Sequence, residues 1–188
     1  MSTALIVGDI QVGIVARFAN AETLLARLVQ AIEAARAAHV PVVFVRSAFR
    51  AGGPEISRRN KAFGPMIGSP AVAGGENDDA RAIHPSVAPL STEVVVTKRR
   101  TSAFSGGDLD IVLRSLDVDH LVLTGLATSG VVLSTVRQAA DLDFRLTVLS
   151  DGCEDFNKEV HDVLMSYVFP RQADVTTVED WISSLSGR

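Results

Sequence analysis

The sequence predicts an α/β fold in which one mostly parallel sheet lies between two layers of helices. Short, continuous apolar segments recur along the chain, as expected for strands that are buried on both faces. Helical patterns separate these segments, which is the order of a parallel sheet with crossover helices. Apolar residues make up 47% of the 188 residues and charged residues 21%, enough for one domain with a sizeable core. We therefore expect residues 1–188 to form a single domain.

Six strands follow from this pattern, with helices between them. The first strand is expected at 4–9, where the apolar run ALIVGD ends in Gly-Asp. The last is a short segment at 174–178, and a closing helix follows it. The other strands are expected at 41–47, 93–98, 120–125 and 145–151, and the other helices at 21–38, 108–116, 129–142 and 158–169.

Residues 48–92 are the exception, because glycine and proline interrupt any long element there. A loop of this length in a compact domain is usually either a functional cover or a flexible insertion. Of these two, we expect a cover over the functional site. The interrupting residues are Gly52, Gly53, Pro54, Gly64, Pro65, Gly68, Pro70, Gly74, Gly75, Pro85 and Pro89.

Composition and charge argue against several classes of partner. The net charge of −4 is spread along the chain and gives no basic patch for nucleic acid. No apolar run approaches the roughly 20 residues that span a bilayer, and STALIVGDIQ lacks a signal-peptide pattern, so we expect a cytoplasmic protein without a membrane partner. The one cysteine, Cys153, cannot form an intrachain disulfide, and the four histidines show no metal-ligand spacing. We expect neither a metal nor another cofactor.

Residues with catalytic chemistry follow several of the expected strands. Asp9 ends the first strand, Lys98 ends the third, the turn 128–131 follows the fourth, and Cys153 follows the fifth. In an open parallel sheet, ligands bind at the carboxyl ends of the strands. A buried carboxylate that faces an ammonium group in a cleft suits proton transfer. The alternative is a structural ion pair that closes the end of the sheet.

The turn TGLATSGVVLSTVRQAA at 124–140 has the features of an anion-binding helix start. Thr128 or Ser129 can cap the helix, and Gly130 lets the backbone approach a ligand closely. The N–H groups of Gly130 and Val131 would then form an oxyanion hole at the positive end of the helix dipole. This pattern alone is weak evidence, because any helix that follows a strand offers such groups.

Three segments together resemble the isochorismatase-like hydrolases, also called the cysteine hydrolase superfamily. They are VGDIQ (7–11), VTKRRTSAF (96–104) and TGLATSGVVLSTVRQAADL (124–142), and the resemblance covers nearly the whole chain. It implies a six-stranded parallel sheet in the order 3-2-1-4-5-6 and a homodimer or homotetramer. It also implies that Asp9 acts as acid or base with Lys98 as its charged partner, and that a cysteine nucleophile starts the helix. A non-proline cis peptide is implied at or beside Leu126-Ala127.

The chain departs from this family at the nucleophile, where the resemblance places Val131. An isopropyl group cannot attack a carbonyl carbon, so the thioester route is closed at this position. One alternative resembles the true isochorismatases, in which a carboxyl group at the position of Asp9 protonates a vinyl ether and water completes the hydrolysis. A nucleophilic Ser129 or Thr128 is a second alternative, although neither has an evident adjacent base, and a nucleophilic Cys153 is a third.

The leading hypothesis is a hydrolase that acts on a small, anionic organic molecule through Asp9 and Lys98. Gln11 would orient Asp9 or the substrate, and Phe104 lies either in the core or at the pocket. A descendant that only binds a metabolite or a partner is the competing hypothesis. The candidates for a substrate carboxylate are Arg46, Arg50, Arg99 and Arg100, each of which could equally be a solvated surface residue.

Overall fold

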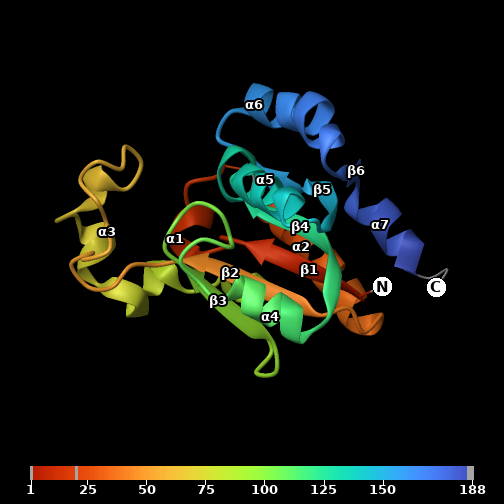
Figure 1. Cartoon of the computed structure of the whole chain (residues 1–188), viewed down its shortest axis with the longest axis horizontal. Helices are drawn as coiled ribbons and strands as arrows, with labels where there is room; N and C mark the ends of the chain where they lie inside the picture. The colour runs from red at the N-terminus through yellow and green to blue at the C-terminus, as the bar shows by residue number, and fades with distance from the viewer. Residues whose placement is uncertain (1, 20, 186–188) are drawn as a thin grey trace.

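The structure is a computed structural model that describes residues 2–19 and 21–185. Six parallel strands form one sheet in the order β3-β2-β1-β4-β5-β6 (Figure 1), which confirms the predicted fold class and strand order. The strands are β1 (Ser2–Gly8), β2 (Val42–Ser47), β3 (Val94–Lys98), β4 (Val118–Leu126), β5 (Arg145–Glu154) and β6 (Asp174–Thr176).

Helices cover both faces of the sheet. One apolar cluster lies between the sheet and helices α2 and α7, and another lies between the opposite face and helices α4 and α5. None of the helices within the described ranges is long and apolar enough to cross a membrane. The helices are α1 (Val12–Val15), α2 (Ala21–Ala37), α3 (Pro70–Ala73), α4 (Leu109–Ser115), α5 (Leu133–Asp141), α6 (Lys158–Val163) and α7 (Val178–Leu185).

Apolar residues at helical spacing explain why these helices pack on the sheet. In α2, Leu24, Leu28 and Ala31 are buried at positions i, i+4 and i+7, so they lie on one face. In α5, Val136 and Ala139 are buried in the same way on the opposite side of the sheet. Burial of each leucine stabilises the fold by about 1.5–3 kcal/mol.

Two glycines bring β1 and β4 close together at their carboxyl ends. Gly8 and Gly125 are opposite each other in the ladder. A Cβ atom on Gly125 would lie 2.2 Å from the carbonyl oxygen of Gly8, and the φ of 141° at Gly125 is one that other residues rarely adopt. Any larger side chain would push the strands apart. The glycine pair therefore lets the turn after β4 approach the residue that follows β1.

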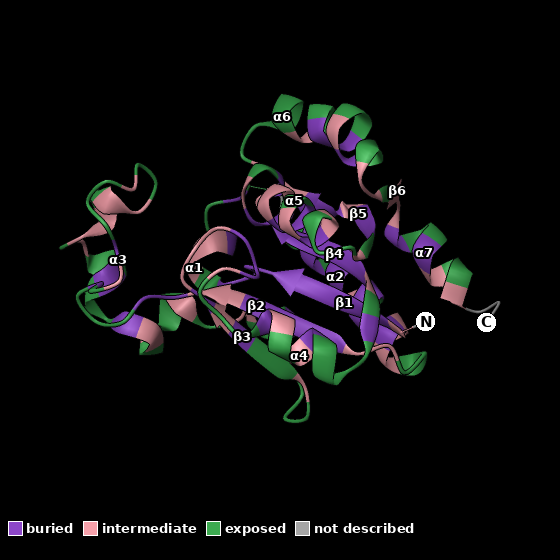
Figure 2. Cartoon of the chain, viewed as in Figure 1, coloured by how far each residue is buried: buried purple, intermediate pink, exposed green. Residues whose placement is uncertain are grey.

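Residues 48–92 contain only short helical turns and divide into two parts. The outer part, 51–74, projects sideways from the sheet (Figure 1) and is largely exposed or half-buried (Figure 2). The returning part lies against the chain after β1, where Gln11 and Ile83 form an isolated antiparallel bridge. Only the returning part therefore lies over the end of β1, whereas the outer part stands clear of it.

Candidate active site

Asp9 and Lys98 form a buried ion pair at the carboxyl ends of the strands. Asp9 directly follows β1, and Lys98 is the last residue of β3. Lys98 Nζ lies 2.8 Å from Asp9 Oδ2 and donates to the carbonyl oxygen of Arg100 at 3.0 Å. Only 6% of Asp9 and 2% of Lys98 is exposed. The two charged residues singled out at the strand ends thus lie together in the structure.

The second carboxylate oxygen of Asp9 has no partner among the described residues. Oδ1 has less than 1 Å² of accessible surface and forms no hydrogen bond. Burial raises the pKa of Asp9, while the positive charges of Lys98 and Arg81 counteract part of this rise. Asp9 also has a φ of 55°, in the left-handed region that costs an L-residue about 1–2 kcal/mol. Strain of this kind clusters at functional sites.

The turn after β4 brings Val131 against the end of β1. The Leu126-Ala127 peptide bond is cis, at the position that the resemblance implied. A turn, Thr128–Val132, follows and leads into α5, and the backbone at Gly130 within it is not helical. A Cβ atom on Gly8 would lie 3.3 Å from both methyl carbons of Val131, so this isopropyl group packs on Gly8. Val131 is only 4% exposed and fills the space beside the strand.

Two side chains that follow β5 hold this turn in place. The Ser129 N–H donates to Asp155 Oδ2 at 2.7 Å, and Thr128 Oγ1 lies 2.8 Å from His161 Nδ1 in a hydrogen bond. Burial lowers the pKa of His161, so its imidazole is neutral at pH 7. The sequence showed no base near Thr128, and the structure supplies one. The strand order was the available signal, because residues after β5 must lie beside residues after β4.

The Gly130 N–H was expected to face the pocket, but it bonds within the turn instead. It donates to the Ala127 carbonyl oxygen at 3.0 Å, because the turn closes on itself before α5 begins. The adjacent Ser129 N–H already faces the carboxylate of Asp155. The N–H groups of Ser129 and Gly130 thus donate to acceptors of the protein itself, and an oxyanion hole formed by Gly130 and Val131 stays a prediction.

The arrangement of the Asp9 and Lys98 side chains suits proton transfer. The Asp9 carboxyl group is oriented by Lys98 through one oxygen, and its other oxygen is buried without a partner among the described residues. A carboxyl group that is oriented in this way can give or take a proton. Within residues 2–19 and 21–185, no three His, Cys, Asp or Glu side chains are grouped so that they could hold a metal ion.

Residues 3–180 match the isochorismatase domain family. This chain belongs to the isochorismatase family. An uncharacterized isochorismatase family protein of Bacillus subtilis, YwoC, is 30% identical over 185 residues, which cover 97% of this chain and 94% of YwoC. The ureidoacrylate amidohydrolase RutB of Stutzerimonas stutzeri is 30% identical over 206 residues, which cover 97% of this chain and 79% of RutB. A solved isochorismatase family protein from Burkholderia thailandensis has a TM-score of 0.88 at 29% identity, covering 98% of this chain and 96% of that chain.

Membership of the isochorismatase family supports a hydrolase.

In this member of the isochorismatase family, the Gln11 side chain connects segments around the candidate site. The Gln11 side chain is fully buried and donates to the carbonyl oxygens of Ser47 at 3.1 Å and Arg81 at 2.8 Å. Its Oε1 accepts from the Ser47 N–H at 2.8 Å. Contact with Asp9 runs through the backbone, where the Gln11 N–H donates to the Asp9 carbonyl oxygen at 2.9 Å. Gln11 thus joins β2, the returning loop and the residue that follows β1.

Phe104 packs in the core of this isochorismatase-family domain. It is 9% exposed, and its ring centroid lies 5.8 Å from that of Phe144. The adjacent Ala103 N–H donates to Thr135 Oγ1 at 3.0 Å, which ties the loop after β3 to α5. Of the two interpretations of Phe104, the structure favours core packing.

The arginines considered for a substrate carboxylate bond to the protein itself. Arg99 pairs with Glu55 at 3.2 Å and also contacts Glu76, so it joins β3 to the outer part of the 48–92 segment. These bonds hold the part of residues 51–74 around Glu55 against the end of β3. The other three guanidinium groups contact Thr97 Oγ1 at 3.0 Å (Arg46), Glu55 Oε1 at 3.6 Å (Arg50) and the Glu55 carbonyl oxygen at 2.9 Å (Arg100).

Cys153 lies where the strand order places it, but its thiol is buried. It is opposite Gly125 in the ladder between β4 and β5, and it is 5% exposed. Burial raises the pKa of Cys153 to about 12. A catalytic thiolate needs the opposite shift, so the structure argues against the amidase route through Cys153.

We expect Cys153 to resist alkylation in the folded protein. With a pKa of about 12, roughly one thiol in ten thousand is ionised at pH 8. Intact-mass measurement after treatment with iodoacetamide should show no label until denaturant is added, and then one label per chain. Stoichiometric labelling of the native protein within minutes would contradict the burial of this thiol and restore it as a nucleophile.

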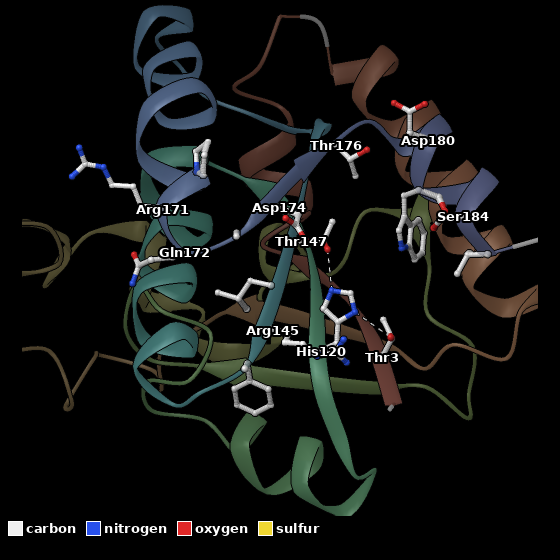
Figure 3. A pocket seen from close by; sticks show the side chains of 16 residues that line it. Thr3, His120, Arg145, Thr147, Arg171, Gln172, Asp174, Thr176, Asp180 and Ser184 are labelled. Carbon is white, nitrogen blue, oxygen red and sulfur yellow. Dashed lines mark hydrogen bonds between the residues drawn. The ribbon is translucent and has the colours of Figure 1, made fainter. Parts of the chain in front are cut away.

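A separate cavity of about 720 Å³ lies at the opposite, amino-terminal edge of the sheet (Figure 3). His120 lies at its wall, with ring nitrogens 3.2 Å from Thr3 Oγ1 and 2.9 Å from Thr147 Oγ1. Thr3 precedes Asp9 by six residues along β1, about 20 Å in an extended strand. This cavity is therefore remote from the ion pair and is not the candidate active site.

Proposed function

We propose that this protein hydrolyses a small organic molecule by acid-base chemistry at Asp9, without a thiol nucleophile. The observation that carries the proposal is the buried, unpartnered Asp9 Oδ1 on a carboxyl group whose other oxygen is 2.8 Å from Lys98 Nζ. A carboxyl group whose pKa is raised by burial keeps its proton to higher pH and can act as a general acid. Val131 supplies no nucleophile at the position where the resemblance implies one.

For an enol ether, the proposed reaction begins with protonated Asp9. Its proton is transferred to the terminal vinyl carbon, and the electron pair of the C=C bond forms the new C–H bond. Water adds to the resulting oxocarbenium ion and returns a proton to the Asp9 carboxylate. The hemiketal then collapses to a carbonyl compound and an alcohol, so protons and electrons balance. Lys98 stabilises the carboxylate that exists between the two steps.

The positive charge of Arg81 favours an anionic substrate. Arg81 was not among the candidates named from the sequence. Its positive charge acts on Asp9, and it is half-buried in the returning part of the loop, where its guanidinium group also donates to the Ala71 carbonyl oxygen. We propose that this guanidinium group attracts the substrate's negative charge toward Asp9. Because the relative RutB is a ureidoacrylate amidohydrolase, amides belong beside enol ethers in a substrate screen.

A binding protein without catalysis is the second candidate function, and the packing of Val131 favours it. The isopropyl group fills the space against Gly8, where a reacting carbonyl would approach a thiol in the cysteine-containing members. Such a protein would bind a metabolite in the same place without turning it over. Stabilisation against heat by a compound from the screen, with no turnover of any compound, would support this candidate.

The pH dependence of kcat/KM tests the acid role of Asp9. If the protonated form is active, kcat/KM falls about tenfold for each pH unit above the pKa of Asp9. Burial raises this pKa above 3.8, so the falling limb should begin at a higher pH than for an exposed aspartate. Lys98→Met should move the limb to higher pH, because the charge of Lys98 lowers the pKa of Asp9. Initial rates with the best substrate of the screen provide the measurement.

A matched control is Glu159→Gln, which removes an exposed carboxylate on α6 and should leave the profile unchanged. Activity that rises with pH throughout the same range would show that ionised Asp9 is the active form. That result would contradict the role of Asp9 as a general acid and would favour a role as a general base.

A further inference from the structure

The cavity at the amino-terminal edge of the sheet, here called the amino-terminal cavity, takes no part in the chemistry proposed at Asp9. Residues of β1, β4, β5, β6 and α7 and of the turn before β6 line it (Figure 3). Its volume of about 720 Å³ lies within the range of about 300–1,000 Å³ that is usual for small-molecule sites. The cavity therefore admits a small organic ligand, and the groups that line it indicate which kind.

Trp181 presents an unused hydrogen-bond donor to the amino-terminal cavity. Its side chain packs in the apolar cluster between the sheet and α2, and Trp181 is only 5% exposed. The indole N–H forms no hydrogen bond with a described residue, yet protein atoms do not fully enclose it. Because Trp181 lines the cavity, we infer that this N–H opens onto it. A buried indole N–H usually has an acceptor, so this position suits an oxygen atom of a ligand.

Two opposite charges of the lining are also unpaired. Arg171, in the turn before β6, and Asp174, the first residue of β6, are both exposed (Figure 3). Neither side chain forms a hydrogen bond or ion pair with a described residue, and the two do not pair with each other. The other charged residues of the lining have partners in the chain: Arg145 bonds to Asp119 at 2.9 Å, and Asp180 accepts from Thr177 at 2.8 Å. The lining thus offers one cation and one anion to a ligand.

The rest of the wall is apolar or bonded within the chain. Phe144 and Leu146 supply apolar surface on the side of β5. The hydroxyl groups of Thr3 and Thr147 bond to the ring nitrogens of His120, so the hydrogen bonds of these hydroxyls are met by the protein. This part of the cavity suits an apolar group of a ligand.

We propose that the amino-terminal cavity binds a small zwitterion with an apolar side chain, of the α-amino acid class. The ligand carboxylate accepts from the Trp181 indole N–H and pairs with Arg171. Its ammonium group pairs with Asp174, and its side chain lies against Phe144 and Leu146. A ligand with only one of the two charges gains only one of the two ion pairs. The site and its ligand are independent of the hydrolysis proposed above.

Trp181 is the only tryptophan of the chain, so its fluorescence reports directly on this cavity. We expect L-leucine to change the fluorescence of the wild type saturably, with a Kd between about 10 µM and 1 mM. Isocaproate and isoamylamine keep the carbon skeleton of L-leucine but lack its ammonium group and its carboxylate, respectively. Each should bind at least about tenfold more weakly than L-leucine. Glycine should also bind more weakly, because it has no apolar side chain.

Variants of the lining, measured by isothermal titration calorimetry, test each contact separately. Asp174→Asn should weaken binding of L-leucine at least about tenfold, so that L-leucine binds no more tightly than isocaproate does. Trp181→Phe keeps an aromatic ring without the N–H and should also weaken binding at least about tenfold, as expected for a hydrogen bond to a charged group. The matched control is Asp141→Asn, which removes an exposed carboxylate outside the cavity and should leave the Kd unchanged.

Asp9→Asn/Lys98→Met separates this site from the candidate active site. It removes the buried ion pair and should bind L-leucine with an unchanged Kd. Circular dichroism establishes that each variant is folded. The absence of both a saturable fluorescence change and a heat of binding with L-leucine would overturn the proposal. Isocaproate or isoamylamine that binds as tightly as L-leucine would overturn it too. Binding that is lost in Asp9→Asn/Lys98→Met but kept in Asp174→Asn would assign the ligand to the ion pair instead.

Discussion

Asp9→Asn is expected to lower kcat/KM by about 10³-fold, within the range of general acid-base catalysis. Asparagine keeps the size of the side chain and can still accept a hydrogen bond from Lys98, but it has no acidic proton to give. The measurement is the initial rate of wild type and variant on the best substrate of a screen that includes enol ethers, amides, carbamoyl compounds and esters. KM should change little, because the loss arises in the chemical step.

The stability of the variant separates lost chemistry from lost folding. Asp9→Asn leaves the Lys98 ammonium group buried without its countercharge, and breaking a buried pair in this way costs about 3–5 kcal/mol. Asp9→Asn/Lys98→Met removes both charges and should recover much of the free energy of unfolding, measured by urea denaturation. Activity should remain absent in the double variant.

Retained turnover in folded Asp9→Asn would contradict the assignment of Asp9. Glu159→Gln serves again as the control, since it neutralises an exposed carboxylate and should keep full activity. If Asp9→Asn and Glu159→Gln were equally active, the ion pair would be a structural closure of the sheet.

The strand-end part of the site could be predicted because parallel strands align their carboxyl ends. Asp9 and Lys98 lie 89 residues apart in sequence, yet each ends an unambiguous apolar run, and the sheet brings them to 2.8 Å. The fold could be predicted from the same apolar runs. Strands that are buried on both faces are typical of parallel sheets with helices on each face, and few other architectures bury them in this way. The cis peptide at Leu126-Ala127 was implied by the resemblance and not by any local preference for cis geometry.

The remaining contacts depend on side-chain directions that sequence patterns do not encode. Asp155 and His161 are polar residues on an exposed segment, and nothing local indicates that they turn back to Ser129 and Thr128. The course of residues 48–92 is set by arginine pairs with Glu55 and Glu76, which any of several arginines could have made. Tertiary pairing of this kind becomes visible only once the strand order fixes which loops are neighbours.

Val131→Cys is expected to create a reactive thiol in a chain that otherwise holds only a buried one. Cysteine is smaller than valine and fits the space against Gly8. The Lys98 ammonium group and the Asp9 carboxylate would serve as a nearby positive charge and a proton acceptor, and both favour thiolate chemistry. In a Cys153→Ala background, the new thiol should titrate below the ordinary cysteine pKa of about 8.5, as followed by thiolate absorbance. Alkylation at neutral pH should be at least about 100-fold faster than at Cys153 in the wild type.

Val131→Ala and Val131→Ser are the matched controls, because they open the same space without a thiol. Amide or carbamoyl hydrolysis that appears only in Val131→Cys would show that the candidate site retains everything except the nucleophile. Enol ether hydrolysis that persists in Val131→Ala would show that valine is not required for the water route. A Val131→Cys thiol that titrates above about 8.5 and stays unlabelled would instead show that Asp9 and Lys98 do not activate this position. In that event the Asp9–Lys98 ion pair would have only a structural role at the end of the sheet. The result would favour a binding protein without catalysis over a hydrolase.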